Sequence, residues 1–168
     1  MDRGGAREAE TGKREIGLEK STSINAALHF CSDTHRSVMT PQTVTRVTEC
    51  DLEPGNVLSV LGDAGNLPKW APVFADAVER VDGARYRVTK NEATFGIELT
   101  THPSAGTVDF IREMPNGRRG GAYLRVMPRP LGGCTITMTV PIGPTTSESE
   151  VAKVLSQELT DLVQLARR

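Results

Sequence analysis

The C-terminal segment SESEVAKVLSQELTDLVQLARR, from Ser147 to Arg168, constrains the fold more than any other part of the chain. Its apolar residues recur at three- and four-residue spacing, which predicts a long helix with one apolar stripe. Ser147 and Glu150 have the S-x-x-E spacing of a capping box, and Arg167 suits the negative end of a helix. The stripe needs a cover, and a sheet is the only cover that we expect from the rest of the chain. The stripe consists of Val151, Val154, Leu155, Leu159, Leu162, Val163 and Ala166.

Short alternating runs separated by turn residues precede this helix and predict antiparallel strands joined as hairpins. From Gln42, the run TVTRVTECD predicts a first strand, because β-branched side chains favour a pleated surface. The later runs are FADAVERV, ARYRVTK, TFGIELTTH, TVDFIRE, GAYLRVM and CTITMTVPI. Together with the helix they predict an α+β fold, in which a curved antiparallel sheet of about seven strands wraps on the long C-terminal helix.

Two short helical segments are predicted between the first strand and the second. Asp51 is expected to cap the first of them, whose early residue Pro54 needs no backbone donor. A second short turn is expected around Trp70, because prolines on both sides restrict the backbone there. The buried side of the first helix is predicted to consist of Val57, Leu58, Val60 and Leu61.

Residues 1–40 mix both signs of charge with Gly and Ser and show no sustained period. This pattern predicts a loose or disordered N-terminal extension. A weak apolar side from Ile24 to Phe30 allows one short helix within it. Met39 is a candidate translation start, since the ordered pattern begins abruptly beside it. We therefore expect an extension at 1–40 and one folded domain at 41–168.

Charge and composition limit the kinds of partner. The chain of 168 residues carries 20 Lys+Arg against 21 Asp+Glu, so no long-range field favours a nucleic acid. No apolar run approaches the ~20 residues that a membrane-spanning helix needs. The N-terminus lacks the apolar core of a signal peptide, so a cytoplasmic protein is expected.

Cysteine usage and motif content predict neither a metal nor a cofactor. The three cysteines, Cys31, Cys50 and Cys134, are scattered and have no C-x-x-C spacing, which predicts no disulfide framework and no zinc site. Cys134 lies in an alternating strand pattern, where a small apolar packing role is favoured over nucleophilic chemistry. The sequence contains no H-E-x-x-H motif, no Gly-rich phosphate loop and no Ser-His-Asp order.

The order of strand, two short helices, antiparallel strands and long helix, over about Thr43 to Arg168, resembles the START-related superfamily. That superfamily, also called SRPBCC, includes polyketide cyclases, lipid-transfer domains and plant pollen allergens. The segment VLSVLGDAGNLPKWAP carries most of the resemblance, since it is similar to the family's first helix, turn and Leu-Pro-x-Trp segment. GTVDFI, LRVMP and the spacing within QELTDLVQL support it. The resemblance implies a helix-grip fold for 41–168, whereas none of these segments is a catalytic signature.

A strongly bent sheet cannot lie flush along a straight helix, so space remains between them unless large side chains fill it. Aromatic residues make up only 4% of the chain, and we therefore expect an incompletely filled interior. Alternation assigns part of its wall if His102 pairs with Thr107 across a hairpin. The inward positions are then Phe95, Ile97, Leu99, Thr101, Val108, Phe110 and Arg112, followed on the last strand by Cys134, Ile136, Met138 and Val140.

The strand around Tyr123 has two open registers. Either Leu124 and Val126 or Tyr123 and Met127 face the interior. If Tyr123 faces inward, its hydroxyl could donate a hydrogen bond to a bound carbonyl; packing is an equally good role for it.

Arg112 is the strongest polar candidate, because the predicted register directs a permanent charge toward the apolar face. It could hold a ligand oxygen, and the alternatives are that it extends to water or pairs with a glutamate. Trp70 could line the cavity mouth, as similar segments do in the resembling family, or pack between the short helices. His102 and Asp109 are diagonal neighbours on the outer face, where a solvated contact is favoured over general-base catalysis.

Three functions remain open from the sequence. The first is non-covalent binding of a small apolar or aromatic molecule between the sheet and the C-terminal helix. The second, implied by the resemblance, is an enzyme of the polyketide cyclase or dehydrase kind that uses Arg112, Tyr123 and His102. The third is an interaction module with a filled core. The expected ligand-binding residues are Trp70, Phe74, Phe95, Ile97, Leu99, Phe110, Arg112, Tyr123, Ile136, Met138, Leu155 and Leu159.

Overall fold

A computed structural model describes residues 43–114 and 117–168. The predicted extension at 1–40, the short helix at Ile24–Phe30, Cys31 and the candidate start Met39 lie outside the described residues. The assignment of 41–168 as one domain stays a prediction.

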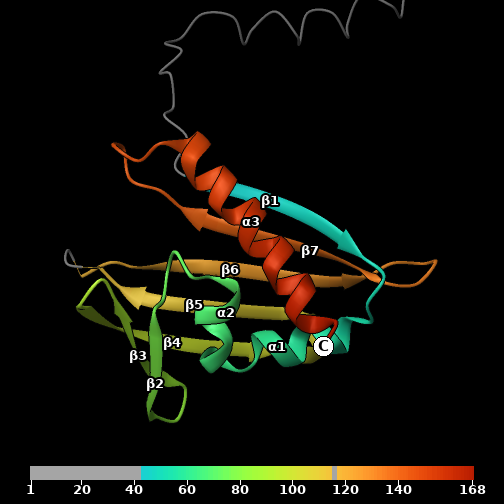
Figure 1. The fold of residues 1–168 in the computed structure, drawn as a ribbon, viewed down its shortest axis with the longest axis horizontal. Helices are drawn as coiled ribbons and strands as arrows, with labels where there is room; N and C mark the ends of the chain where they lie inside the picture. The colour runs from blue at the N-terminus through green and yellow to red at the C-terminus, as the bar shows by residue number, and fades with distance from the viewer. Residues whose placement is uncertain (1–42, 115–116) are drawn as a thin grey trace, which may run out of the picture. The chain divides into compact units, whose positions relative to one another are not determined.

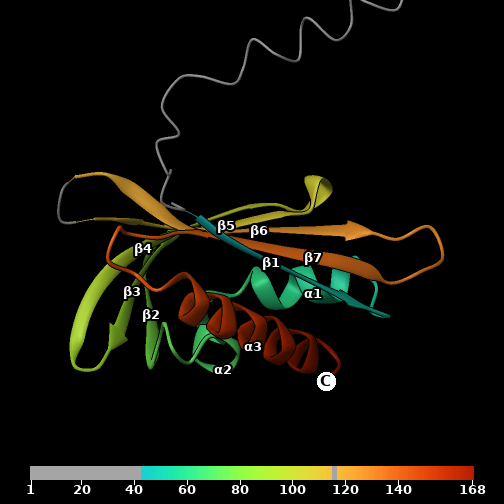
Figure 2. The same cartoon turned by 90° about the horizontal axis from the view of Figure 1, so that it is seen from above.

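The described residues form a seven-stranded antiparallel sheet with three α-helices on one face (Figures 1 and 2). The strands follow the order β1-β7-β6-β5-β4-β3-β2 across the sheet. Their bounds are β1 Thr43–Cys50, β2 Ala77–Asp82, β3 Arg85–Lys90, β4 Ala93–His102, β5 Thr107–Glu113, β6 Arg119–Pro128 and β7 Cys134–Pro141. The helices are α1 Pro54–Leu61, α2 Leu67–Trp70 and α3 Glu148–Ala166, with short 3-10 turns at Ala64–Asn66 and Pro103–Ala105. This arrangement confirms the predicted α+β helix-grip architecture.

The β4–β5 hairpin has the predicted register, with His102 opposite Thr107. Its connection closes at Gly106, whose φ of 63° is a left-handed conformation that glycine adopts without strain. A Cβ atom at Gly106 would lie 2.1 Å from the carbonyl oxygen of Val126, so a larger residue does not fit there. The hairpin is therefore fixed both by its turn and by its contact with β6.

The open register of β6 is resolved in favour of Leu124 and Val126. These two side chains are 1% and 2% exposed, whereas Tyr123 and Met127 are 40% and 43% exposed. Tyr123 pairs with Asp109 and Thr139 on the face of the sheet away from the helices. On β7, Cys134, Ile136 and Met138 are buried as predicted.

The long helix α3 has the predicted N-cap, because the Ser147 hydroxyl accepts a hydrogen bond from the Glu150 backbone N–H at 3.4 Å, which is one of the two hydrogen bonds of a capping box. Its apolar stripe packs against β1, α1 and α2. The expectation that the sheet alone covers this stripe is therefore wrong. The short helices supply part of the cover because they lie on the same face of the sheet as α3 (Figure 2).

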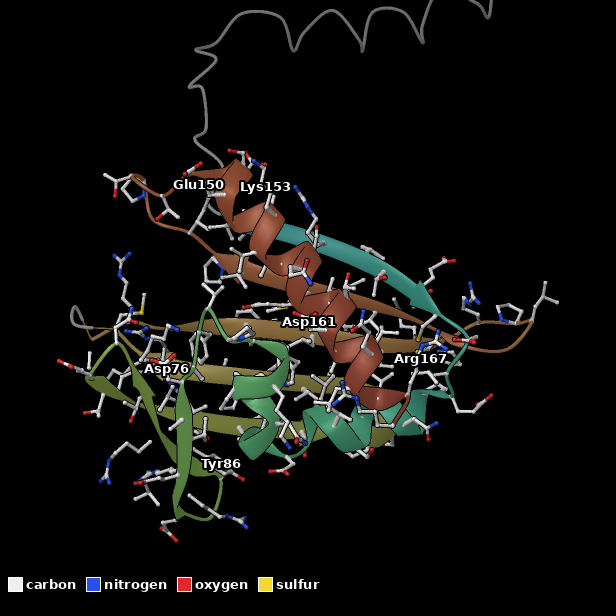
Figure 3. All side chains as sticks on the ribbon, in the orientation of Figure 1. Asp76, Tyr86, Glu150, Lys153, Asp161 and Arg167 are labelled. Carbon is white, nitrogen blue, oxygen red and sulfur yellow. The ribbon has the colours of Figure 1, made fainter. Side chains whose placement is uncertain are left out.

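The start of α1 also differs from the prediction. Glu53, not Asp51, occupies the N-cap position, and its side chain makes no capping hydrogen bond. The Asp51 carboxylate instead accepts hydrogen bonds from the Arg167 guanidinium at the end of α3, which is labelled in Figure 3. Pro54 alone favours the helix start, since its missing donor is not needed in the first turn.

Candidate functional site

A cavity of about 350 Å³ lies between the first half of α3 and the sheet. Such a volume is at the small end of the range for ligand pockets, ~300–1,000 Å³. The wall combines apolar and small side chains with two charged ones, Arg112 and Glu158. The other lining residues are Leu67, Trp70, Ala71, Val73, Phe74, Phe110, Met114, Gly120, Gly121, Ala122, Met138, Val140, Pro141, Val151, Val154 and Leu155.

Small residues on β6 explain why this space is hollow. Gly120, Gly121 and Ala122 line the cavity on the sheet side, and Val151 and Val154 face it from α3. Short side chains on both walls leave volume that leucine or phenylalanine would fill. Gly121 also permits a close approach, because a Cβ atom there would lie 1.8 Å from the carbonyl oxygen of Phe110. A larger residue at Gly121 would displace the strand that carries Phe110 and Arg112.

Three aromatic rings, those of Trp70, Phe74 and Phe110, line the cavity. The Trp70 and Phe110 ring centroids are 5.8 Å apart with planes tilted by 56°. Phe74 meets Phe95 edge to face, with centroids 5.3 Å apart. The Arg112 guanidinium carbon lies 4.4 Å from the centre of the Phe95 ring, a distance suited to a cation–π contact.

The segment that carries Phe74 is held in place by a charged network at the β3–β4 turn. Lys90 Nζ donates to the Pro72 carbonyl oxygen at 2.7 Å and to Asp76 Oδ1 at 2.6 Å. The Asn91 backbone N–H donates to Asp76 Oδ2 at 2.8 Å. The hydrogen bond from Lys90 lowers the pKa of the Asp76 carboxyl, which is labelled in Figure 3. This network ties the chain after α2 to the sheet and so positions one side of the cavity.

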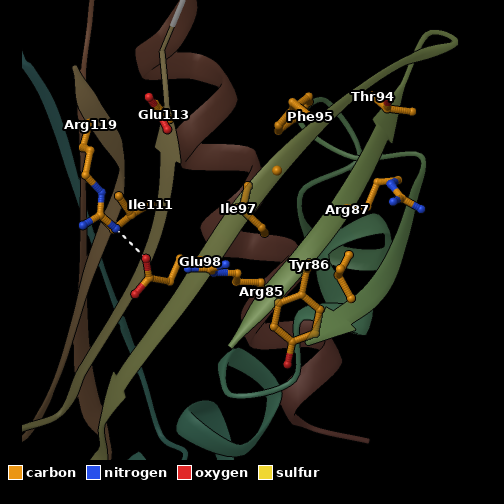
Figure 4. Close-up of a pocket in the computed structure, with 12 residues that line it drawn as sticks. Arg85, Tyr86, Arg87, Thr94, Phe95, Ile97, Glu98, Ile111, Glu113 and Arg119 are labelled. Atoms are coloured by element: carbon orange, nitrogen blue, oxygen red, sulfur yellow. Dashed lines mark hydrogen bonds and ion pairs between the residues drawn. The ribbon is translucent and has the colours of Figure 1, made fainter. Parts of the chain in front are cut away.

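A second hollow, an open groove of about 760 Å³, lies along β3, β4 and β5 (Figure 4). The β4–β5 ladder ends at the pair Glu98 and Ile111, so beyond that point β4 pairs only with β3, and β5 pairs only with β6. Charged side chains, including an Arg119–Glu98 ion pair of 2.6 Å, line this groove. Its polar and open character makes it a weaker candidate for an apolar ligand than the cavity beneath α3.

Two charged groups on the cavity wall have no charged partner within residues 43–114 and 117–168. Arg112 Nε is buried without a hydrogen-bond acceptor among the described residues. The guanidinium lies over the Phe95 ring. Glu158, on α3, is only 4% exposed and forms neither a hydrogen bond nor an ion pair with any described residue. Burial, and to a smaller extent the Asp161 charge, raise the pKa of Glu158 to about 7.

Sequence reasoning missed Glu158, although a signal was present. Glu158 lies three residues after Leu155 and four before Leu162, so it occupies the apolar stripe of α3. A carboxylate at such a position is costly unless something compensates for it. The break in the stripe could therefore have marked the residue as a candidate.

The structure places half of the expected site residues on the cavity. Trp70, Phe74, Phe110, Arg112, Met138 and Leu155 line it. Leu99, Ile136 and Leu159 are buried in the surrounding core, and Phe95 and Ile97 border the open groove. Tyr123 does not reach the cavity, because the β6 register turns it to the other face of the sheet.

The buried thiols offer no reactive centre. The Cys50 and Cys134 sulfur atoms are 3.3 Å apart in the pairing of β1 with β7, and both residues are buried. Burial, followed by the hydrogen bond between Cys134 and Cys50, raises the pKa of Cys134 to about 12, which disfavours a nucleophilic thiolate. Within 43–114 and 117–168, no group of three or more His, Cys, Asp or Glu side chains is placed to hold a metal ion.

Comparison of the fold with solved structures decides the architecture. A START superfamily protein from Mycobacterium smegmatis superposes with a TM-score of 0.51 at 13% identity, over 74% of this chain and 93% of that one. The chain has a START-type helix-grip fold. XoxI from Bacillus cereus matches this fold with a TM-score of 0.56 at 15% identity, over 74% of this chain and 95% of that one.

Aha1 from Colwellia psychrerythraea, solved as a dimer, gives the START-type chain a TM-score of 0.55 at 15% identity, over 71% and 92% of the two chains. At such identities the likeness shows the fold alone. No protein-family profile matches the chain, and no curated protein matches it in sequence. Among its described residues, no helix is long and apolar enough to cross a membrane.

Proposed function

We propose that this START-type chain binds a small apolar or aromatic molecule in the cavity beneath the first half of α3, without a covalent step. The observation that carries the proposal is a hollow of about 350 Å³ with an aromatic side, lined by Trp70, Phe74 and Phe110. Protein interiors are normally close-packed, so a cavity of this size between packed elements favours a ligand over a filled core. The same cavity weighs against a pure interaction module.

Lipid-type and polyketide-type compounds are the ligand classes that we first expect to fit, because apolar and aromatic groups form most of the wall. A cyclase or dehydrase that uses Arg112, Tyr123 and His102 is not supported, since these side chains do not converge. Tyr123 is on the outer face, and His102 is an exposed residue at the end of β4. The proposal is therefore one of binding.

Trp70 supplies a built-in reporter for the test, because it is the only tryptophan in the chain and it lines the cavity. Titration with anilinonaphthalene sulfonate is expected to change Trp70 emission and to raise the melting temperature of the protein. Fatty acids and aromatic polyketide-like compounds are then expected to displace this dye.

A matched pair of β6 variants locates the bound dye. Ala122→Leu adds bulk inside the cavity and is expected to weaken dye binding about tenfold or more. Tyr123→Leu changes the neighbouring residue on the outer face and is expected to leave binding unchanged. The proposal is wrong if neither the dye nor any compound of the panel alters Trp70 emission or melting temperature, or if Ala122→Leu binds like wild type.

A further inference from the structure

The cavity contains a guanidinium and a carboxyl group on facing walls, and neither has a charged partner among the described residues. Arg112 extends from β5 on the sheet side, and Glu158 extends from α3 on the helix side. No ion pair joins them in the part of the chain that the structure describes. Each group lines the same apolar hollow, so each is available to a molecule bound there.

Both groups are expensive to keep at these positions without a partner. Burying a polar or charged group without a partner destabilises the folded protein, because the group loses its hydrogen bonds to water. Glu158 stands in the apolar stripe between Leu155 and Leu162, where leucine would pack without that cost. Trp70, another residue of the cavity wall, has its Nε1 atom buried without a hydrogen-bond partner among the described residues. The cavity wall therefore has polar groups that a purely apolar ligand would leave without hydrogen-bond partners.

The surroundings of Glu158 allow it to exchange a hydrogen bond with a ligand near neutral pH. Asp161 faces it from its own helix, and Arg112 lines the opposite wall. Lys69, on α2, borders Asp161 at the surface. With its pKa raised to about 7, the Glu158 carboxyl can donate a proton in a hydrogen bond or accept one.

We propose that the ligand carries two polar ends on an apolar body: an anionic or carbonyl oxygen held by Arg112, and a hydroxyl or N–H group that hydrogen-bonds with Glu158. A small aromatic hydroxy acid has this chemistry. The inference rests on the proposed function, because it specifies the ligand of the same cavity. It goes further in that an oily molecule of equal size without the polar ends binds less tightly.

A series of bicyclic probes tests this inference by isothermal titration calorimetry. A hydroxynaphthoic acid with its two groups on opposite rings is compared with its methoxy ether, with naphthol and with naphthalene. The hydroxy acid is expected to bind about tenfold tighter than the methoxy acid, which lacks the donor, and than naphthol, which lacks the anion. Para-hydroxybenzoic acid and a hydroxybiphenyl carboxylic acid bracket the spacing between the polar ends.

Variants assign each end of the ligand to its residue. Arg112→Met is expected to abolish the tighter binding of the hydroxy acid relative to naphthol. Glu158→Leu is expected to abolish its tighter binding relative to the methoxy acid. Arg87→Met, at an arginine of the open groove, serves as the control and is expected to change neither preference. The probe series on the wild-type protein keeps the test valid if a variant does not fold.

The possible outcomes separate the two proposals. If naphthalene and the hydroxy acids of all three lengths bind equally well, the ligand inference is overturned and the proposed function stands. If no probe binds, both are overturned. If the hydroxy acid is preferred but the preference survives in both folded variants, the assignment to Arg112 and Glu158 is overturned.

Discussion

The two halves of α3 face the interior in different ways. At the hollow end, Val151, Val154 and Leu155 border a cavity of about 350 Å³. At the filled end, Leu159 and Leu162 are 1% and 0% exposed within the hydrophobic core and border no such space. One continuous amphipathic helix therefore serves both to close a cavity and to complete a core.

The difference comes from the residues opposite the helix. The hollow end faces Gly120, Gly121 and Ala122 on β6, whereas the filled end shares its core with Val57 and Leu61 of α1. A gap between a straight helix and a bent sheet is thus closed at one end by a short helix and by bulky side chains. At the other end it stays open because the facing residues are small.

The largest expected effect is on stability at the filled end. Leu162→Ala should lower the free energy of unfolding by about 2–5 kcal/mol, because it creates a void in a close-packed region. Leu155→Ala should cost about half as much, since one side of Leu155 already borders empty space. Urea unfolding of both variants without ligand measures the difference. Equal costs, or a larger cost for Leu155→Ala, would show that the two ends are packed alike.

The next effect is the pH dependence that Glu158 introduces at the hollow end. Its pKa is raised from 4.5 to about 7, so the folded protein binds this proton more tightly than the unfolded chain does. The stabilisation from Glu158 is complete below about pH 4.5 and is lost as the pH rises through about 7. A pKa difference of this size corresponds to about 3 kcal/mol.

Glu158→Gln removes that titration while nearly preserving the shape of the side chain. The variant is expected to be more stable than wild type above pH 7 and to lose this advantage toward pH 4.5. Chemical unfolding across this range, with the wild-type curve subtracted from that of the variant, isolates the contribution of Glu158. A difference that does not change with pH would mean that the carboxyl is not held in a dry environment.

Local patterns explain which features could be predicted from the sequence. The α3 cap at Ser147 and the pairing of His102 with Thr107 depend on residues close together in the chain, so spacing and turn chemistry were sufficient. The face of Tyr123 could not be predicted, because both registers of β6 place some apolar residues inward. The pairing of β6 with β5 and β7 decides between them.

The hollow end was predictable only in outline. Bending of the sheet predicted unfilled space somewhere along α3, but its position depends on Gly120–Ala122 meeting Val151 and Val154 across the interior. That meeting is a tertiary property that periodicity does not contain. Glu158 was overlooked for a different reason: its place in the apolar stripe was visible in the sequence, but a charged residue within an amphipathic helix is normally assigned to the solvent side.

The smallest expected effect concerns the exposed ion pair that joins the end of α3 to the connection after β1. The hydrogen bond from Arg167 holds the pKa of Asp51 below its ordinary value of 3.8. The stabilisation from this pair is therefore present above that pH and is lost as the pH falls and Asp51 takes up a proton. Arg167→Gln should lower the melting temperature slightly at neutral pH, because solvent-exposed pairs contribute little.

Melting temperatures measured at decreasing pH separate the effect of the Asp51–Arg167 pair from that of Glu158 at the hollow end. The gap between wild type and Arg167→Gln should close well below pH 3.8, in the opposite sense to the Glu158→Gln difference, which opens as the pH rises. Dye binding in the cavity should be unchanged in Arg167→Gln, because Arg167 lies outside the lining residues. Loss of dye binding in the variant would mean that the filled end controls the shape of the cavity. A gap that persists after Asp51 is protonated would mean that Arg167 stabilises the protein by a means other than the Asp51 charge.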